Sequence, residues 1–164
     1  MSDKLFDISG KVTLVSGGSR GIGRALAAGF AQRGAKVIIT GRDESTLAQT
    51  ASELSTPECQ VETLVCDVAD VEAVKSGVET VHSRHGRIDV LLNVAGVNIR
   101  QPSLSFTEEQ YNFVMDINLK GAFFIAQEVG RRMVKQGSGS IVNIDSLNTY
   151  APLKNVMPYA MSKA

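Results

Sequence analysis

Three side chains near the carboxyl-terminal end of the sequence are of types that together can move a proton to or from an oxygen atom. Tyr159 and Lys163 are four residues apart, which places both on one face of a helix, and Ser146 precedes Tyr159 by thirteen residues. An ammonium group beside a phenol stabilises the phenolate, so Tyr159 could give a proton to a carbonyl oxygen and accept it in the reverse reaction. Ser146 would hydrogen-bond the same oxygen. Alone, a Tyr and a Lys at this spacing indicate only a helix face.

A glycine-rich segment near the start of the chain has the pattern of a nucleotide-binding loop. Gly17, Gly21 and Gly23 form a Gly-x-x-x-Gly-x-Gly motif between an apolar run and a helical pattern. Gly17 would allow a tight turn, Gly21 a close approach of ligand to backbone, and Gly23 close packing of helix on strand. Because a helix N-terminus bears partial positive charge, we expect a pyrophosphate group there. The alternative is a glycine-rich turn that binds nothing.

Basic residues near this loop bear on which nicotinamide dinucleotide would bind. The second apolar run ends at Thr40-Gly41-Arg42, at a point where an acidic side chain would accept from a ribose 2′-hydroxyl and repel a 2′-phosphate. Arg42, with Arg20 from the glycine loop, favours NADP through charge-assisted contacts. NAD stays the alternative, because the Asp43 carboxylate could reach the ribose. Both arginines could also be solvated surface charges.

These residues need a scaffold, and the sequence alternates short apolar runs with amphipathic helical patterns. The predicted strands are 12–15, 36–40, 61–65, 88–92 and 140–144, and the predicted helices are 22–33, 45–54, 71–81, 107–136 and 159–164. Such alternation is typical of right-handed βαβ crossovers. We therefore expect an α/β fold of the Rossmann type: a doubly wound parallel sheet with helices on both faces. About five strands of the 3-2-1-4-5-6 order are expected, with the carboxyl-terminal strands missing, so that 1–164 would be a single, incomplete dinucleotide-binding domain.

Composition and charge argue against several classes of protein. The chain has 164 residues, of which 43% are apolar, enough for one domain. The charges of 17 basic and 17 acidic residues cancel, and neither sign is clustered in a block. We therefore expect a small-molecule partner rather than nucleic acid or a membrane surface. No apolar run is long enough to span a bilayer. Two cysteines and the absence of a secretory-signal pattern at the N-terminus predict a cytoplasmic location, and no His or Cys spacing suggests a metal site.

Taken in order, these motifs resemble the short-chain dehydrogenase/reductase family over nearly the whole chain. The matching segments are Gly17 to Gly23, Asn93-Val94-Ala95-Gly96, Asn118 within Met115-Asp116-Ile117-Asn118, and Ser146 with Tyr159-Ala160-Met161-Ser162-Lys163. The resemblance implies an NAD(P)-dependent oxidoreductase that transfers hydride between a carbonyl and a secondary alcohol. Members of the family continue well past the position of Ala164 and usually pair through the long fourth helix, which implies a homo-oligomer for the full-length proteins.

The resemblance also assigns roles to individual residues. Tyr159 would be the acid/base, Lys163 would bind the nicotinamide ribose and assist Tyr159, and Ser146 would hold the substrate oxygen. Asn118 would anchor a water relay. The positions that would contact the dinucleotide are Gly17, Ser19, Arg20, Gly21, Ile22, Gly23, Arg42, Asp67, Val68, Asn93, Ala95, Gly96, Tyr159 and Lys163.

The substrate is less closely defined by the sequence. Residues 96–102 resemble the gluconate 5-dehydrogenase-like members of the family, which implies a sugar acid such as gluconate or 5-ketogluconate, with Asn98, Arg100 and Ser146 as substrate contacts. A carboxylate at Asp145, where a small residue is common in the family, could disfavour an anionic substrate or favour a hydroxylated one. A 3-oxoacyl carrier-protein reductase is the alternative enzyme. The alternative of another class is a truncated, non-catalytic nucleotide-binding or interaction module.

Overall fold

A parallel sheet of five strands, in the order β3-β2-β1-β4-β5, forms the centre of the molecule. The computed structural model describes residues 7–57, 59–151 and 153–164, so the N-terminal residues judged for a secretory signal lie outside the described residues. The strands are β1 (Val12–Ser16), β2 (Lys36–Gly41), β3 (Glu62–Val65), β4 (Val90–Asn93) and β5 (Ser140–Asn143). The predicted Rossmann-type α/β fold is confirmed.

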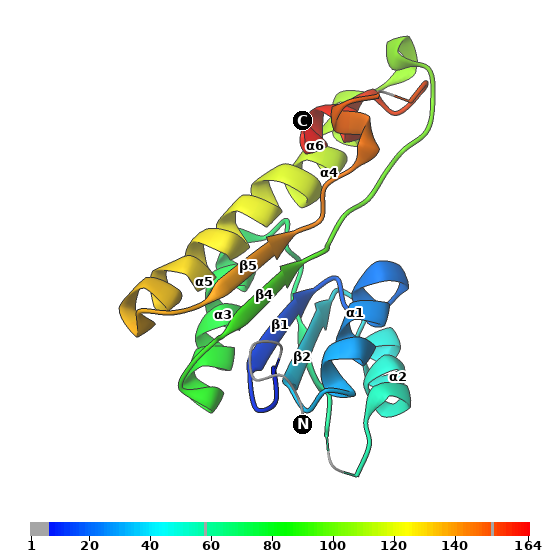
Figure 1. Cartoon of the computed structure of the whole chain (residues 1–164). Helices are drawn as coiled ribbons and strands as arrows, with labels where there is room; N and C mark the ends of the chain where they lie inside the picture. The colour runs from blue at the N-terminus through cyan, green and yellow to red at the C-terminus, as the bar shows by residue number, and fades with distance from the viewer. Residues whose placement is uncertain (1–6, 58, 152) are drawn as a thin grey trace.

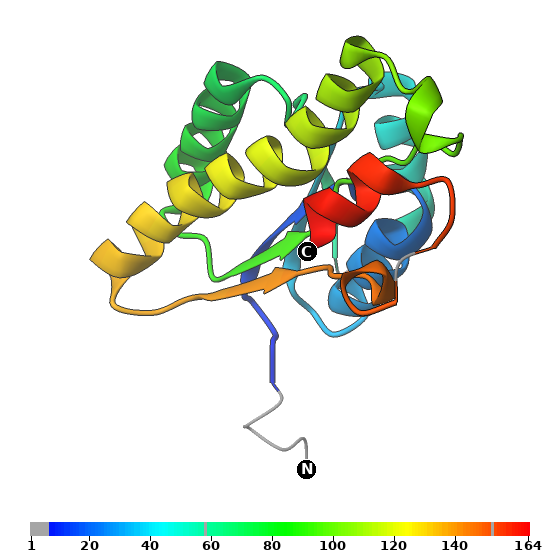
Figure 2. The same ribbon diagram turned by 90° about the horizontal axis from the view of Figure 1, so that it is seen from above.

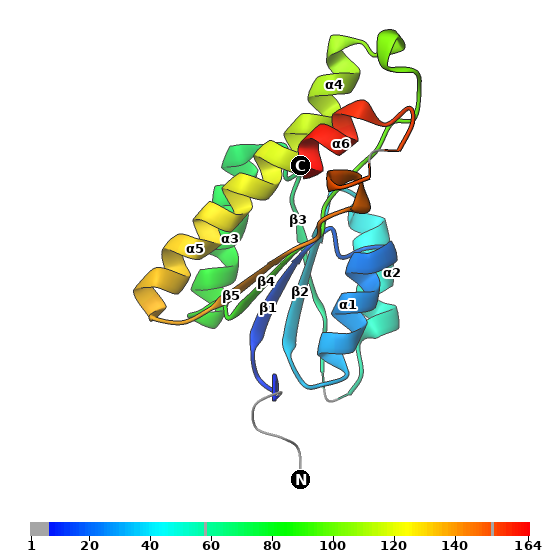
Figure 3. The same cartoon turned by 45° about the horizontal axis from the view of Figure 1, so that its top comes forward.

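Helices cover both faces of the sheet, and others lie above its carboxyl end. One face is covered by α1 (Gly21–Ala31) and α2 (Glu44–Leu54), and the other by α3 (Val71–His85) and α5 (Ala122–Gln136) (Figure 1 and Figure 3). Beyond the ends of the strands lie α4 (Glu108–Met115), α6 (Met157–Lys163) and the 3-10 turns η2 (Ser103–Ser105) and η4 (Leu147–Thr149), and Figure 2 shows this end from above. Among the described residues, no helix combines the length and apolarity needed to cross a membrane.

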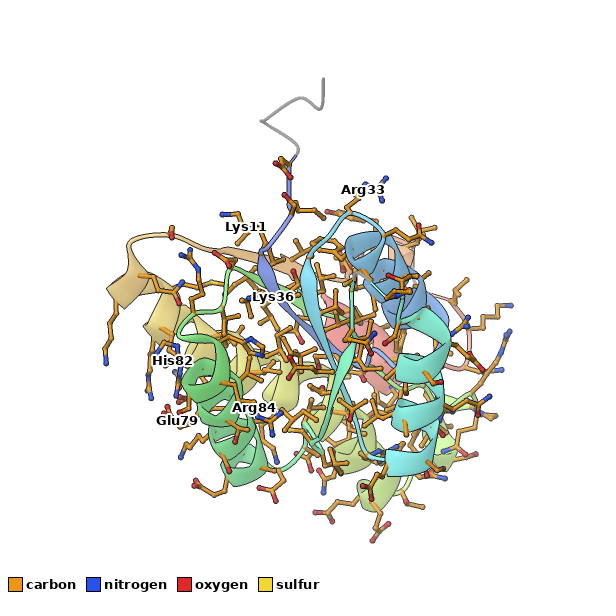
Figure 4. All side chains as sticks on the ribbon, turned by 90° about the horizontal axis from the view of Figure 1, so that it is seen from below. Lys11, Arg33, Lys36, Glu79, His82 and Arg84 are labelled. Atoms are coloured by element: carbon orange, nitrogen blue, oxygen red, sulfur yellow. The ribbon has the colours of Figure 1, made fainter. Side chains whose placement is uncertain are left out.

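The apolar runs form strands because both sides of the sheet are covered. All five residues of β1 are buried, as expected for a central strand of a parallel sheet. Successive side chains of β1 enter different clusters: Leu14 packs with Ile125 of α5, and Val15 packs with Ala27 of α1. At the opposite end of the sheet from α4 and α6, Lys11 and Lys36 flank the starts of β1 and β2 (Figure 4).

An ion pair joins the two helices of the second face. The Arg132 guanidinium donates from Nη2 to the Glu79 carboxylate at 2.7 Å, and Figure 4 shows Glu79 on α3. Arg132 also donates to Glu128 at 3.1 Å, and Arg131 donates to the other oxygen of Glu128 at 2.8 Å. Glu128 is only 6% exposed, so its charge depends on these two arginines.

Several predicted element boundaries differ from the structure. The first helix, predicted to reach residue 33, ends at Ala31, and the third continues to His85, four residues past its predicted end, before a left-handed Gly86. The strand predicted at 88–92 begins at Val90, although the backbone of Asp89 already forms hydrogen bonds with Val12 at the start of β1 and with Ser140 at the start of β5.

The predicted helix 107–136 is divided in three. It begins with the predicted capping box, in which the Thr107 hydroxyl and the Gln110 side chain satisfy each other's backbone N–H groups. After α4 the helix becomes a π-helical turn, η3 (Asp116–Gly121), and then continues as α5. π-helical turns often occur at functional positions, and this one places Asn118 in the interior at 4% exposure.

Candidate active site

The glycine loop connects β1 to α1 and leaves the start of that helix free to bind an anion. Arg20 occupies the N-cap position without a capping side-chain hydrogen bond, and the first turn of α1 contains no acidic residue. The first N–H groups of a helix lack partners within the helix, and they favour a negatively charged ligand. The backbone N–H groups of Gly17 and Gly18 donate to the Thr40 carbonyl at 3.1 and 3.0 Å, which fixes the loop to β2.

Two glycines of the loop have different structural reasons to be glycine. A Cβ at Gly23 would lie 2.1 Å from the Gly17 carbonyl oxygen, so the loop and the helix meet backbone to backbone. Gly21 has a φ of +53° and no atom within 4 Å of an ideal Cβ position, and it borders a cleft. A side chain there would fill space that a ligand phosphate could occupy.

The cleft bordered by this loop has a volume of about 480 Å³ and lies at the carboxyl ends of the strands. Among the residues expected to contact a dinucleotide, those that line it are Gly17, Ser19, Arg20, Gly21, Ile22, Gly23, Arg42, Asp67, Val68, Ala95 and Gly96. The lining residues outside this expected set are Thr40, Gly41, Asp43, Cys66, Val94, Val97 and Ile117. Val97 and Ile117 adjoin motif residues, and that adjacency is the signal that could have found them.

Positive charge in the cleft is available for a ligand. Among the described residues, the Arg20 and Arg42 side chains make no hydrogen bond or ion pair with protein. Asp43 lines the same cleft and also caps α2: its Oδ1 accepts from the Thr46 N–H at 2.7 Å. Hydrogen bonds from Thr46 and Ser45 lower the pKa of Asp43 to about 2, so the carboxylate is ionised and one of its oxygens is occupied by the cap.

Asn93 does not line the cleft at the glycine loop but lines a second hollow at the same end of the sheet. Its side chain is 6% exposed, and the amide Nδ2 donates to the Ala122 carbonyl at 2.9 Å and to Asn143 Oδ1 at 3.1 Å. Side chains alternate between the faces of a strand, and that of Asn93 points to the face covered by α5. Asn93 thus joins β4, β5 and α5 instead of lining the cleft.

Asn118 links the loop after β4 to the helix that contains Tyr159. Its Oδ1 accepts from the Val97 N–H at 2.8 Å, and its Nδ2 donates to the Val97 carbonyl at 2.9 Å and to Ser162 Oγ at 3.1 Å. The Ser162 hydroxyl in turn donates to the Tyr159 carbonyl at 2.8 Å. The Asn118 side chain is therefore occupied by protein groups, and the water relay implied by the family stays a prediction.

Lys163 and Asp145 meet at the carboxyl end of β5. Lys163 Nζ donates to the Ile144 carbonyl at 2.6 Å. The Ser146 backbone N–H, the Thr149 hydroxyl and the Lys163 charge together lower the pKa of Asp145, so this carboxylate is charged at neutral pH. Asn118, Asp145 and Lys163 also line the second hollow, which has a volume of about 360 Å³.

The remaining predicted residues lie near this end without lining either hollow. Tyr159 is half-buried on α6 and Ser146 is half-buried after β5, where Ser146 Oγ accepts from the Asn148 N–H at 3.2 Å. Asn98 and Arg100 are exposed on the loop after β4. In the part of the chain that the structure describes, no cluster of His, Cys, Asp and Glu could hold a metal ion.

Comparison with known proteins defines the class. The family model for short chain dehydrogenase matches residues 11–164. The chain therefore belongs to the short-chain dehydrogenase family, a class of NAD(P)-dependent oxidoreductases that act on small molecules.

Three relatives illustrate the similarity. Gluconate 5-dehydrogenase from Gluconobacter oxydans is 38% identical over 159 residues, which cover 97% of this chain and 62% of the relative. The crystal structure of an NAD⁺-bound xylitol dehydrogenase has a TM-score of 0.91 at 31% identity, covering 95% of this chain and 60% of that one. A metagenomic short-chain oxidoreductase in complex with NADP has a TM-score of 0.91 at 32% identity, covering 96% of this chain and 72% of that one. The chain thus spans about 62% of the length of the gluconate relative.

Proposed function

We propose that residues 1–164 form one dinucleotide-binding domain of an NADP-dependent oxidoreductase that interconverts a carbonyl group and a secondary alcohol. The observation that carries this proposal is the convergence on one cleft of an uncapped helix N-terminus and two arginines, Arg20 and Arg42, whose guanidinium N–H groups have no hydrogen-bond or ion-pair partner among the described residues. We propose a sugar acid such as gluconate or 5-ketogluconate as substrate, supported by the similarity to gluconate 5-dehydrogenase.

The residues of the cleft fit a phosphorylated dinucleotide. The N–H groups at the start of α1, with the open space at Gly21, suit a pyrophosphate. Arg42 and Arg20 suit a ribose 2′-phosphate, because a guanidinium offers several N–H donors to one phosphate. Asp43 also lines the cleft, but its Oδ1 caps α2, and this capping role favours NADP over NAD. The buried Thr40 hydroxyl has no protein partner and borders the same cleft.

In the proposed reaction two side chains, Tyr159 and Ser146, act on the substrate oxygen, and two others, Lys163 and Asn118, support Tyr159. When bound, the dinucleotide supplies or accepts hydride at the substrate carbon. In the reducing direction the Tyr159 phenol donates its proton to the carbonyl oxygen, and the Ser146 hydroxyl donates a hydrogen bond to that oxygen. The Lys163 ammonium stabilises the resulting phenolate. Asn118 acts on the backbone of α6, through Ser162.

Substrate recognition must accommodate the charge of Asp145. A sugar-acid carboxylate would be repelled by this exposed, ionised group, so we propose that Arg100, with Asn98, receives the substrate carboxylate on the loop after β4. We also propose that the whole protein is cytoplasmic and forms a homo-oligomer. Light scattering of the purified protein measures the oligomeric state.

Calorimetric titration with NADPH and NADH tests the cofactor. We expect NADPH to bind more tightly, and Arg42→Ala to weaken NADPH about tenfold or more, since a hydrogen bond to a charged group contributes about 1.5–3 kcal/mol. Arg33→Ala is the matched control, because Arg33 is exposed at the opposite end of the sheet (Figure 4). Equal affinity for the two dinucleotides would refute the NADP assignment.

Turnover tests the reaction and the substrate. NADPH absorbance is followed after addition of 5-ketogluconate or of an acetoacetyl thioester, and Tyr159→Phe should abolish any decrease. Turnover of the thioester alone would favour an oxoacyl reductase. Tight NADPH binding without turnover of either substrate would support a non-catalytic nucleotide-binding module.

A further inference from the structure

Arg42 lies over an aromatic ring that does not itself line the cleft. The guanidinium carbon of Arg42 is 5.9 Å from the ring centroid of Phe113 on α4, within the range of an attractive cation–π contact. We propose that Phe113 is a positioning residue that holds Arg42 in the orientation needed to bind the 2′-phosphate of NADP. This inference rests on the proposed function and assigns a role to a residue that no motif includes.

The contact leaves the binding groups of Arg42 free. A guanidinium stacks through its flat face, while its N–H donors point outward in its plane. Phe113 can therefore restrict the orientation of Arg42 without competing with a phosphate for hydrogen bonds. Arg42 is exposed, and an exposed arginine loses substantial side-chain freedom when it is fixed on a ligand. Contact with a ring before binding reduces the freedom that remains to be lost.

Phe113 is suited to this role because both ends of its helix are tied down. At the start of α4, Gln110 completes the capping box with Thr107 and also accepts a hydrogen bond from Gln101 on the preceding loop. At its end, α4 continues into η3, where Asn118 binds both the N–H and the carbonyl of Val97.

The ring also lies on the side of the helix that borders the cleft. Arg42, which the ring contacts, lines the cleft, and so does Ile117 at the start of the π-helical turn that follows α4. Phe113 is 40% exposed, whereas the following residue, Val114, is fully buried. Packing of α4 therefore does not depend chiefly on Phe113, and its aromatic ring can be removed with limited effect on the fold.

The test compares two nucleotides that differ only in the 2′-phosphate, adenosine 2′,5′-bisphosphate and 5′-AMP, by calorimetric titration. Phe113→Leu and Phe113→Met remove the ring but keep an apolar side chain, and Phe113→Tyr keeps the ring. Phe123→Leu is the matched control, because Phe123 is an exposed aromatic residue of α5 outside the nucleotide cleft. Circular dichroism verifies that each variant is folded.

We expect Phe113→Leu and Phe113→Met to weaken the bisphosphate about two- to fivefold, the range of an exposed cation–π contact, and to leave 5′-AMP unchanged. Phe113→Tyr and Phe123→Leu should match the wild type for both nucleotides. In the double variant Phe113→Leu/Arg42→Ala, the loss should equal that of Arg42→Ala alone, because the ring acts only through the arginine.

Three outcomes separate this inference from the proposal it rests on. If the wild-type chain binds both nucleotides equally, the NADP assignment fails and the role of Phe113 fails with it. If Arg42→Ala abolishes the preference while the ring-less variants retain it, the inference alone is wrong. If those variants weaken both nucleotides to the same extent, Phe113 supports the fold in general and does not position Arg42.

Discussion

Replacement of Gly21 by alanine tests two separate reasons for a glycine at this position: its left-handed backbone conformation and the space that a ligand phosphate would need. Gly21 has a φ of +53°, and an alanine Cβ there would meet no atom within 4 Å. A left-handed backbone costs a non-glycine residue about 1–2 kcal/mol, which corresponds to a decrease of about 2–8 °C in Tm for a chain of this size. The new methyl group would project into the cleft that the loop borders.

The methyl group would keep a phosphate away from the N–H groups at the start of α1. Loss of one hydrogen bond to a charged group costs about 1.5–3 kcal/mol, so we expect NADPH affinity to fall by at least about tenfold. Gly86→Ala is the matched control: its φ is +73° and its Cβ would also meet open space, but it ends α3 away from the cleft. Calorimetric titration and thermal unfolding should show similar losses of stability in both variants and a loss of affinity only in Gly21→Ala. If both bind NADPH equally well, the phosphate does not lie at Gly21.

Three further changes test the packing of the fold by urea denaturation. Gly23→Ala should destabilise the protein by about 1–3 kcal/mol or more, because its Cβ would lie 2.1 Å from the Gly17 carbonyl oxygen; a stability equal to that of the wild type would contradict this backbone contact. Burial opposes ionisation of Asp89, but hydrogen bonds from Arg87 and from the Val12 N–H outweigh it and lower the pKa of Asp89. The contribution of Asp89 to stability is therefore complete above the unfolded pKa of about 3.9, and it is lost as the pH falls through the pKa of the folded state. Asp89→Asn should therefore cost more stability at pH 7 than at pH 3, and an equal cost at both pH values would refute the stabilising ion pair between Asp89 and Arg87. Arg132→Met should cost at least about 1 kcal/mol, but less than the 3–5 kcal/mol of a fully broken buried pair, because Glu128 keeps a second arginine; a neutral effect would mean that Glu128 does not need this partner.

The sheet could be predicted from the sequence because its determinants are local. Each strand of the sheet's centre is a short apolar run, and each crossover contains a helix whose apolar positions recur with helical spacing. Right-handed crossovers then leave few possible strand orders. The glycine loop was predictable for the same reason, since the turn, the ligand approach and the helix packing fall on three glycines within seven residues.

The differences from the sequence prediction arise where distant segments decide the structure. Hydrogen bonds to Ala122 and Asn143 hold the amide of Asn93 on the face covered by α5, so Asn93 lines the second hollow and not the cleft at the glycine loop. The ends of α1 and α3 depend on packing at their last turns, which periodicity does not define. The contact of Phe113 with Arg42 joins residues on opposite halves of the chain, and no spacing rule predicts such a pair.

The Asn118 side chain joins the proposed binding and catalytic regions. Val97 lines the nucleotide cleft, and Asn118 binds both backbone groups of Val97. The same amide reaches Ser162, which holds the backbone of Tyr159. Because Asn118 and Ser162 are both more than nine-tenths buried, breaking this chain of hydrogen bonds would leave buried polar groups without partners, at a cost of about 1–3 kcal/mol each. These hydrogen bonds therefore hold the loop after β4 against the helix of the proposed acid/base, and the π-helical turn is the feature that brings Asn118 inward to make this connection.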